Sequence, residues 1–377
     1  MKNTKLSKSK TKTKVLLAMS GGVDSSVAAL LLQKQGYEII GAFMKNWSNT
    51  KNDFGECAWR DERRMAMKIA NMLNIPLITL DFEKQYKKEV VQDMFNNYKK
   101  GITPNPDVIC NNKIKFPLLW KEAKKRHCDF VSTGHYARIK KTNKGYFLLR
   151  AKAENKDQSY FLYRLNENDL SHTLFPIGNL NKEQVREIAK QNHFPNFNKK
   201  STSGICFIGK VNLKSFLKHK IKPKKGLILD PNKNKIGEHD GVYYYTIGQR
   251  IGPRFGLDLN KLQFDNKKQL KRWYVAKKDT KNNIIIAAPE GHRLLLRKEI
   301  TIKQIHLINK NTKLPATAYA RIRNVGELLP CKIITNKRTK QIKVILNKAI
   351  TGISKGQAIV LYINKVVLGG GVIDFKD

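Results

Sequence analysis

The sequence predicts an α/β protein with an N-terminal Rossmann-like domain built on a parallel sheet, a small β-rich central domain and a C-terminal β-barrel-like domain. Strand and helix signals alternate over the first two hundred residues, which is typical of a parallel sheet covered by helices. Near residue 210 the pattern changes to short β-rich segments separated by turn residues, as in barrels and sandwiches. The length of 377 residues allows two or three domains of about 100–200 residues each.

The elements of the first domain follow from short apolar runs and helical spacing. The expected strands are short runs rich in apolar residues, at 15–19, 38–44, 76–82 and 128–139, the last running into a loop. The expected helices have apolar residues at helical spacing, at 25–35, 63–73 and 84–100. Gly36 and Gly101 follow two of these helices, as helix stop signals do. Ligand sites are therefore expected at the carboxyl ends of the strands.

The second half reads as a helix over 213–219, a linker over 220–226 and then short β segments. The β segments are expected at 241–248, 272–278, 282–288, 316–323, 331–336, 341–346, 357–364 and 366–373. No internal repeat is found in the sequence. The expected organisation is a flexible basic tail at 1–14, a catalytic domain at 15–215, a central domain at 216–291 and a barrel domain at 292–377.

The chain is strongly basic, with 73 Lys and Arg against 30 Asp and Glu, so its net charge is +43. Such a charge favours polyanionic partners, and nucleic acid is the first candidate. The excess is spread along the chain, and the richness in Lys, Asn and Ile is also what an AT-biased genome would produce. Charge alone therefore leaves two explanations open, compositional drift and a nucleic-acid-binding face. The tail at 1–14 is a weaker candidate for an RNA-binding arm.

Composition excludes several other classes. Hydrophobic residues make up 41% and charged residues 27%, so the chain is not wholly disordered. No apolar run approaches the roughly 18–20 residues of a membrane-spanning helix, and the run after the basic N-terminus is too short for a signal peptide, so a cytoplasmic protein without membrane contact is expected. The five cysteines include no CxxC pair, which argues against a disulfide scaffold, and no zinc-ribbon or other protein metal site is predicted.

The strongest local signal is the loop Ser20-Gly21-Gly22-Val23-Asp24-Ser25-Ser26, between a buried strand and a helix. Its two glycines let the backbone approach a phosphate, and the helix N-terminus presents free N–H groups to an anion. Asp24 is a candidate to hold Mg²⁺ that accompanies the phosphates. The loop has no lysine of the Walker type, so it is not a standard P-loop. An ordinary capped helix after a turn is the alternative reading.

The loop resembles the PP-loop of ATP pyrophosphatases, and eight further motifs in order resemble the tRNA-specific 2-thiouridylase (MnmA) family. These motifs are Phe43–Trp47, Thr103–Asp107 with Cys110-Asn111 and Ile114–Phe116, Thr133–Tyr136, Lys156–Leu162, Gly204–Gly209, Ile236–His239, Thr246–Arg250 and Gly369–Gly371. The resemblance covers nearly the whole chain, from about Lys14 to Ile373. It implies an enzyme that uses ATP to convert the wobble uridine, position 34, of tRNA to 2-thiouridine through adenylation of O2.

The resemblance also implies site residues. The expected ATP contacts are Ala18, Met19, Ser20, Gly21, Gly22, Val23, Asp24, Ser25, Met44 and Gly134. The expected contacts with the target base are Asn105, Pro106 and Asp107. The expected tRNA contacts are His135, Lys156, Asp157, Gln158, Arg321, Ile322 and Gln357. Arg321 and Arg323 are expected to alternate along one strand and to present both guanidinium groups on one face, suited to phosphate, although a solvated strand face is the alternative.

The cysteines divide into two groups. Cys128 precedes a strand and Cys331 lies inside a β segment, so both are expected to be small buried hydrophobic residues. Irregular loops are expected around the other two, Cys110 because of the nearby Pro104 and Pro106, and Cys206 because glycines bracket it. Asp107 is close enough to touch the Cys110 thiol if a helical turn begins there. Cys57 stays ambiguous, with a structural role favoured.

By resemblance, Cys206 carries sulfur as a persulfide delivered by a donor protein. Cys110 is the nucleophile that releases sulfide or closes a Cys110–Cys206 disulfide, and Asp107 belongs to the same catalytic group. Thiolates do this work, so both sites are expected to be electropositive and accessible at the moment of reaction. One departure from the family pattern is Ser201, which stands where an acidic residue is usual. The alternatives are another PP-loop enzyme, such as a 4-thiouridine synthase or an adenylating ligase, and a non-catalytic RNA-binding protein.

Overall fold

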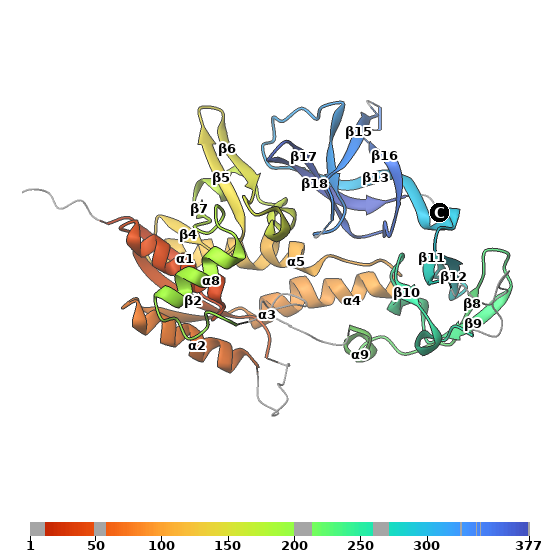
Figure 1. Cartoon of the computed structure of the whole chain (residues 1–377), viewed down its shortest axis with the longest axis horizontal. Coiled ribbons are helices and arrows are strands. Elements are labelled where there is room, and N and C mark those ends of the chain that lie inside the picture. Colours follow the sequence, from red (N-terminus) through yellow and green to blue (C-terminus); the bar gives the residue numbers. More distant parts are fainter. Residues whose placement is uncertain are drawn as a thin grey trace, which may run out of the picture.

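The computed structural model describes residues 12–48, 58–199, 213–258, 271–324, 326–336, 338–339 and 341–375, and it contains three separate sheets. Figure 1 shows the N-terminal α/β part at one end, the small central part at the other, and the barrel above the helices that join them. The α/β class and the order of parallel sheet, central domain and barrel are as the sequence predicts. The expected domain boundaries at 215 and 291 stay predictions. In the described part of the chain, no helix is long and apolar enough to cross a membrane.

The N-terminal sheet has five strands in the order β3-β2-β1-β4-β7, all parallel. Its strands are β1 (Lys14–Ala18), β2 (Glu38–Lys45), β3 (Leu77–Asp81), β4 (Phe130–Ser132) and β7 (Thr173–Leu174). Along β1, Val15 and Leu17 belong to one hydrophobic cluster and Leu16 to another, because successive side chains point to opposite faces of a strand. The chain order reverses between β1 and β4, which is where open α/β sheets bind ligands.

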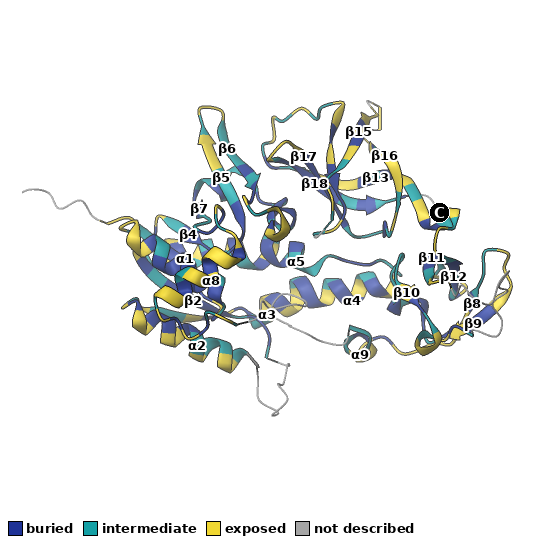
Figure 2. Ribbon diagram, viewed as in Figure 1, coloured by how far each residue is buried: buried dark blue, intermediate teal, exposed yellow. Residues whose placement is uncertain are grey.

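Helices cover both faces of this sheet. The cluster around Val15 and Leu17 includes residues of α1 (Val23–Lys34), α2 (Ala58–Met72) and α8 (Lys182–Gln191). Figure 2 shows that α2 keeps an exposed outer face while α1 is largely buried. The cluster around Leu16 includes two longer helical runs, each interrupted by a π-helical segment. These runs are α3 (Glu83–Tyr86), η1 (Lys87–Val91) and α4 (Gln92–Lys99), then α5 (Pro106–Ile109), η2 (Cys110–Lys115) and α6 (Phe116–Lys125).

The barrel closes through six strands, because β13 pairs with both β16 and β18. They are β13 (Leu296–Leu307), β14 (Thr317–Arg321), β15 (Leu329–Thr335), β16 (Ile342–Thr351), β17 (Ala358–Ile363) and β18 (Val366–Asp374). The hairpin β5 (Ala137–Thr142) and β6 (Gly145–Arg150) belongs to the first domain in sequence but joins the barrel sheet through Leu149 and Val366. This pairing was not predicted, because it joins residues more than two hundred positions apart.

The central part contains a five-stranded sheet in the order β10-β11-β12-β8-β9. Its elements are α9 (Leu213–Lys218), β8 (Gly226–Leu229), β9 (Lys235–His239), β10 (Arg250–Ile251), β11 (Trp273–Asp279) and β12 (Ile284–Pro289). The expected strand at 241–248 is wrong, because Val242–Tyr244 forms a 3-10 helix. Gly241 has φ of 143°, and Asn283 accepts the N–H of Val242, so the chain turns where it was expected to run straight.

Candidate active site

The glycine loop lies between β1 and α1 at the carboxyl edge of the sheet. Gly21 has φ of 73°, a left-handed conformation that favours glycine, and a Cβ there would lie 2.3 Å from the carbonyl oxygen of Glu62. Ser25 and Ser26 donate from their hydroxyls to the Gly22 carbonyl, at 3.0 and 3.1 Å. The loop is therefore folded by its own serines, and Gly22 stands at the N-cap position without a side chain that would occupy the helix N-terminus.

The loop after β4 packs directly on the start of α1. A Cβ on Gly134 would lie 2.7 Å from the backbone nitrogen of Ser25 and 2.8 Å from the carbonyl carbon of Asp24. On the other side of β1, the backbone N–H of Met19 donates to Ala42, and Met44 follows two residues later on β2. The residues predicted to contact ATP thus gather on one sheet edge, from the strand ends of β1, β2 and β4.

Asp24 is held by two residues that the sequence analysis did not assign. The hydroxyl of Tyr136 and the ammonium of Lys182 both donate to its Oδ1, each at 2.7 Å. Burial, assisted by the Asp24 carboxylate, raises the pKa of Tyr136, so that hydroxyl stays protonated and donates. The side chain of Lys182 is only 6% exposed, and it brings a positive charge to a loop that has no Walker lysine. Tyr136 lay within a recognised motif, whereas nothing in the sequence links Lys182 to a residue 158 positions earlier.

Asn196 and Lys199 also contact the glycine loop. Asn196 donates from Nδ2 to the Gly21 carbonyl at 3.1 Å and to the Ser26 hydroxyl at 3.0 Å. Lys199 reaches the same carbonyl at 3.5 Å and pairs with Glu62 at 2.8 Å. These contacts connect the residues just before the segment that contains Cys206 to the glycine loop.

Cys110 lies inside a continuous helical run, so the expected irregular loop around it is wrong. Asn105 caps α5 by accepting the N–H of Val108 at 3.3 Å, and Pro106 occupies the first turn, where its missing N–H has no cost. The same residues that suggested a loop are therefore helix-start signals. A helical turn does begin before the thiol, as expected for contact with Asp107. Cys110 itself is the first residue of the π-helix η2.

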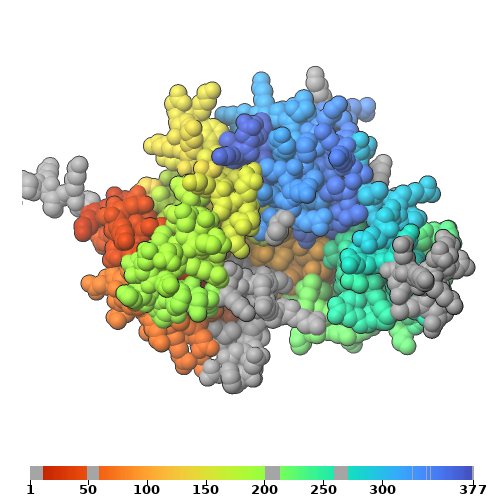
Figure 3. All heavy atoms as spheres, in the orientation of Figure 1, coloured from red at the N-terminus to blue at the C-terminus, as the bar shows by residue number. Residues whose placement is uncertain are grey.

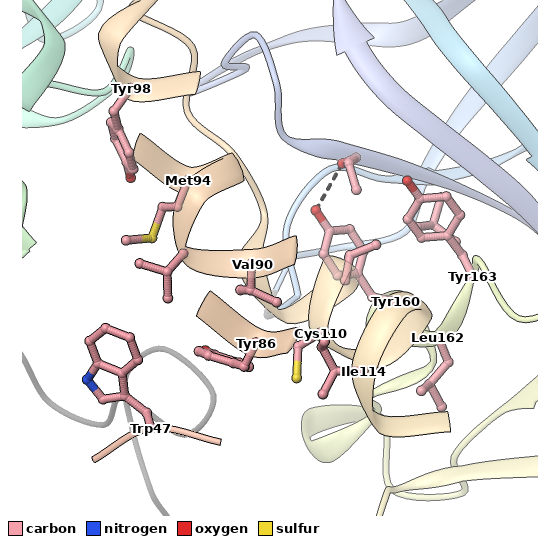
Figure 4. Packing of buried hydrophobic residues seen from close by; sticks show 14 of the residues in the cluster. Trp47, Tyr86, Val90, Met94, Tyr98, Cys110, Ile114, Tyr160, Leu162 and Tyr163 are labelled. Carbon is pink, nitrogen blue, oxygen red and sulfur yellow. Dashed lines mark hydrogen bonds between the residues drawn. The ribbon is translucent and has the colours of Figure 1, made fainter. Parts of the chain in front are cut away.

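The thiol of Cys110 is completely buried, with 0% exposure, in the cluster on the α4 side of the sheet. Figure 4 shows it between Tyr86 and Ile114, with Trp47 beyond Tyr86. The ring centroids of Trp47 and Tyr86 are 6.4 Å apart. Trp47 also contacts Phe216 of α9, with ring centroids 6.2 Å apart. A thiol in this position needs a local opening before it can react.

Cys206 and Ser201 lie outside the described residues, as does Cys57. The described chain ends before Ser201 and Cys206 at Lys199, which lies beside the glycine loop. It resumes after them at α9, whose Phe216 lies against Trp47. Cys128 and Cys331 are both buried, as expected, and Cys331 donates to the Ala318 carbonyl within the barrel.

The segment 101–105, which leads into α5, contacts both other parts of the protein. Thr103 donates its N–H to the Lys355 carbonyl of the barrel, and its hydroxyl lies 3.1 Å from that of Thr246 in the central part. Gln357 donates from Nε2 to the carbonyls of Thr103 and Pro104, at 3.2 and 2.8 Å. The barrel and the central part thereby fix the backbone from which Asn105 and the Cys110 helix start.

Tyr160 also connects the first domain to the barrel. Its hydroxyl donates a hydrogen bond at 2.9 Å to the Ala358 carbonyl (Figure 4). The same hydroxyl lies 3.3 Å from the carbonyl of Ile322, and Asn105 donates to it from Nδ2 at 3.5 Å. In this structure, therefore, the segments of Asn105, Ile322 and Gln357, all predicted to contact tRNA, meet at the interface between the first domain and the barrel.

Asp157 and Arg321, also predicted tRNA contacts, form a buried ion pair with each other. Arg321 is the last residue of β14, so the expected alternation of Arg321 and Arg323 along one strand is wrong. Arg323 lies beyond the strand end and is exposed. Gln158 exchanges hydrogen bonds with the backbone of Tyr136, whereas Lys156 is exposed to solvent.

His135 is enclosed. Its ring stacks on Phe116 with centroids 5.9 Å apart and meets Phe175 edge-on at 6.1 Å. Burial, with a smaller effect of Lys115, holds the pKa of His135 well below its usual value, so the ring is neutral. Lys115 lies 3.5 Å from Nε2 and can only donate, so Nδ1 carries the proton toward the Thr133 hydroxyl at 2.7 Å.

A cleft of about 410 Å³ lies between the first domain and the barrel, on the side of α4. Asn105 and Ile109 line it. Its charged lining is mixed, and Lys303 pairs with Asp374 at 2.8 Å. The basic residues are Lys113, Arg164, Lys303 and Lys355, and the acidic ones are Glu89, Asp93 and Asp374. Figure 3 shows the orange helices of the first domain recessed beneath the blue barrel. In the described part of the chain, no group of three or more His, Cys, Asp or Glu side chains is arranged to hold a metal ion.

Comparison with known proteins covers nearly the whole chain. Residues 13–210 match the tRNA methyl transferase HUP domain, 214–289 the tRNA methyl transferase PRC-barrel domain, and 297–373 the aminomethyltransferase beta-barrel domain. The chain is 39% identical over 373 residues to the tRNA-specific 2-thiouridylase MnmA of Bacillus pumilus, covering 97% of this chain and 96% of that protein. It is 41% identical to the protein of the same name from Nitrosomonas europaea, covering 96% and 98%.

Solved structures resemble the chain less closely. A complex of a 4-thiouridine synthetase with RNA and bound ATP has 17% sequence identity and a TM-score of 0.38, over 52% of this chain and 46% of that one. This similarity is too low to support an argument about the site.

Proposed function

This chain belongs to the tRNA-specific 2-thiouridylase family, and we propose that it converts the wobble uridine of tRNA to 2-thiouridine in an ATP-dependent reaction. The observation that carries the proposal is the glycine loop at the point where the strand order reverses, packed by Gly134 on one side and anchored through Asp24 on the other. A second chemical group, the Cys110 thiol, lies in the same domain on the helical run that starts at Asn105.

The residues at the sheet edge fit ATP. Gly21, Gly22 and Gly134 leave room where a Cβ would collide with the backbone or crowd the loop, and the N-terminus of α1 offers N–H groups to phosphate. ATP, when bound, would supply an adenylyl group that lets the uridine oxygen leave as part of AMP. Lys182 and Lys199 place positive charge beside the loop. Oδ1 of Asp24 is occupied by two donors, which leaves Oδ2 as the oxygen that would hold Mg²⁺.

The reaction has two halves. The uridine O2 displaces pyrophosphate from the α-phosphate of ATP, so an O2–phosphorus bond forms and the bond between the α- and β-phosphates breaks. The outer sulfur of a Cys206 persulfide, supplied by a donor protein, then reaches C2, the C2–O2 bond breaks, and AMP leaves with that oxygen. Thiolate nucleophiles serve such exchanges.

Cys110 completes the transfer in one of two ways. Its thiolate attacks the inner sulfur of Cys206 after the bond to C2 has formed, or it releases sulfide from the persulfide before that bond forms. Both routes leave a Cys110–Cys206 disulfide, which an external thiol must reduce. Because Cys110 is buried among Tyr86 and Ile114, the binding of RNA has to open this packing, and Asp107, three residues earlier, acts as its partner.

The net charge of +43 and the position of Asn105 at the cleft support RNA as the substrate. Asn105 lines the cleft between the first domain and the barrel, with lysines and Arg164 around it. Pro106 and Asp107 follow Asn105 in the first turn of α5, which is the segment proposed to meet the target base. Lys156 is exposed and suited to a phosphate contact. Asp157, Arg321, Ile322 and Gln357 instead take part in contacts between the first domain and the barrel, and Gln158 is bonded to the backbone of Tyr136 within the first domain.

The proposal is tested by incubating the purified protein with unmodified tRNA, ATP, Mg²⁺ and a persulfide source, and then analysing tRNA nucleosides by mass spectrometry. We expect 2-thiouridine at the wobble position, with AMP and pyrophosphate as the nucleotide products. ADP with phosphate, or sulfur at position 4 of a uridine elsewhere in the tRNA, would contradict the proposal. Omission of ATP is the control, and it should leave the tRNA unmodified.

A further inference from the structure

Asn46, just after β2, is the buried side chain of the described residues in which two polar atoms lack a hydrogen-bond partner. It directly follows Lys45, the last residue of the strand, and its side chain is only 1% exposed. In the described part of the chain, neither its Nδ2 nor its Oδ1 has a hydrogen-bond partner. Burying an amide without partners is costly, so such groups are rare in folded proteins and call for an explanation.

The backbone on both sides of Asn46 is well fixed. Lys45 pairs with Asp81 at 2.9 Å and with Glu83 at 3.3 Å. Ser48 donates to Glu83 from its N–H at 3.1 Å and from its hydroxyl at 2.7 Å. Asn46 therefore lies between two side chains that are paired, those of Lys45 and Ser48, whereas its own amide and the neighbouring Nε1 of Trp47 have no partner in the described part of the chain.

Other buried amides of the protein are used to hold the fold. Asn283, 5% exposed, accepts the N–H of Val242 and donates to the carbonyls of Lys224 and Lys225. All of its hydrogen-bonding groups are thus engaged by the chain itself. No polar group of the described chain forms such hydrogen bonds with the Asn46 amide, so we expect this amide to pair with a bound ligand.

The position of Asn46 indicates which molecule. β2 lies next to β1, whose end carries the glycine loop, and Asn46 is two residues beyond Met44 on the same sheet edge. A nucleotide with phosphates at the N-terminus of α1 extends its base across the neighbouring strand ends. An amide offers one donor group and one acceptor side by side, which matches the 6-amino group and a ring nitrogen of adenine.

We propose that the Asn46 side chain reads the adenine ring of ATP by a paired hydrogen bond. This rests on the proposed function, because it assumes that the glycine loop binds ATP. The unliganded fold then bears the cost of an unpaired buried amide, and the nucleotide removes that cost when it binds. Asn46 is a specificity residue for the nucleotide, and Trp47 beside it packs on Tyr86 and Phe216 to hold the segment in place.

The test compares the wild type with Asn46→Leu, which keeps the branching at Cγ but removes both polar atoms, and with Asn46→Ala. Without nucleotide, Asn46→Leu is expected to unfold at the same temperature as the wild type or at a higher one. Calorimetry without tRNA should show ATP binding weakened about tenfold or more, as for a lost base contact. Inosine triphosphate lacks the 6-amino group, so the wild-type preference for ATP over it should fall toward one in both variants.

Asn283→Leu is the matched control, and it should lower the unfolding temperature while keeping the ATP affinity. Unchanged ATP affinity and unchanged preference in both Asn46 variants would overturn the inference but leave the proposed function standing. A loss confined to tRNA affinity would also overturn it, since Asn46 would then face the RNA. A wild-type protein that does not bind ATP at all would overturn both.

Discussion

Arg321 of the barrel donates from Nη1 to Oδ2 of Asp157 at 2.7 Å, although 164 residues separate them. The two side chains are 4% and 0% exposed. Asp157 also accepts from the backbone N–H groups of Ala151 and Ser159, from the Ser159 hydroxyl and from Nε of Arg150. One carboxylate therefore organises the joint between the first domain and the barrel.

Removing the carboxylate should cost more than removing the guanidinium. Asp157→Ala removes the acid that pairs with the buried Arg321 and leaves the buried Arg150 with the exposed Glu154, so we expect a loss of about 3–5 kcal/mol in the free energy of unfolding. Arg321→Met leaves Asp157 with its other four donors and should cost less. Urea unfolding measures both. Lys343→Met, which breaks the exposed pair with Glu299, is the control and should cost much less than Asp157→Ala. Equal losses for Asp157→Ala and Arg321→Met would contradict this account.

The salt dependence of tRNA binding separates an exposed lysine from the buried arginine. Each neutralised phosphate contributes about 0.7–0.9 to the slope of log affinity against log salt concentration. Lys156→Ala should lower that slope by about one unit and weaken binding to different tRNA sequences alike. Arg321→Met should leave the slope unchanged, because its guanidinium is engaged by Asp157. A lower slope for Arg321→Met would show that Arg321 leaves Asp157 for a phosphate in the complex.

Gly134 should tolerate no side chain. A Cβ at this position would lie 2.7 Å from the backbone of Ser25, at the start of α1, so Gly134→Ala must push the two loops apart. We expect ATP affinity to fall at least tenfold, a loss of about 1.4 kcal/mol in binding free energy. Calorimetric titration with ATP measures this. Gly252→Ala is the matched control, because nothing lies within 4 Å of its Cβ position and its backbone is extended, with φ of −158°. Equal ATP affinity in the two variants would show that the close approach of Gly134 is not needed.

His135 should make the fold sensitive to acid. Its pKa is lowered by burial, so below pH about 6.5 the unfolded chain takes up a proton that the folded chain does not. The free energy of unfolding should then fall by about 1.4 kcal/mol per pH unit on account of this residue. His135→Gln should remove that part of the slope between pH 6 and 5, while the exposed His219→Gln should keep it. Identical slopes for all three proteins in urea unfolding would refute a neutral buried ring.

The sequence predicts the strands and helices of the first domain well because local patterns determine them. The run 15–19 and the glycine loop appear as β1 and the start of α1, since a continuous apolar strand and a helix-start signal are both local. The strand β13 was not predicted, because bulges near Arg297 and between Lys303 and His306 break the alternation of its side chains.

The contacts that shape the candidate site depend on the fold as a whole. Lys182 reaches Asp24 across 158 residues, and Gln357 reaches Thr103 across 254. No periodicity or motif links such positions, so the sequence indicates only which loops carry chemistry. The burial of Cys110 was also missed, because the prolines near it were interpreted as loop formers although they start a helix.

Substitutions of the two reactive cysteines should block sulfur transfer at different steps. Cys206→Ser should abolish thiolation, because serine cannot carry a persulfide, while ATP binding at the glycine loop is kept. Cys110→Ser should also abolish or strongly reduce turnover, but Cys206 should still accept sulfur from the donor. Peptide mass spectrometry with and without the sulfur source should therefore show the persulfide mass on the Cys206 peptide of Cys110→Ser. Adenylation needs neither thiol, so adenylated tRNA is expected to accumulate in both variants.

Cys128→Ser and Cys331→Ser are the controls for the loss of a thiol as such. Burial raises the pKa of Cys331 to about 11, and the Cys128 and Cys331 thiols contact backbone carbonyls, so neither is poised to react. Each variant should lose about 1–2 kcal/mol of stability through packing and keep most of its activity. If Cys206→Ser still thiolates tRNA, or if the persulfide forms on Cys128 or Cys331, sulfur must travel by another route. Cys110 would then have no partner in the transfer, and its place at the start of η2 would need a structural explanation.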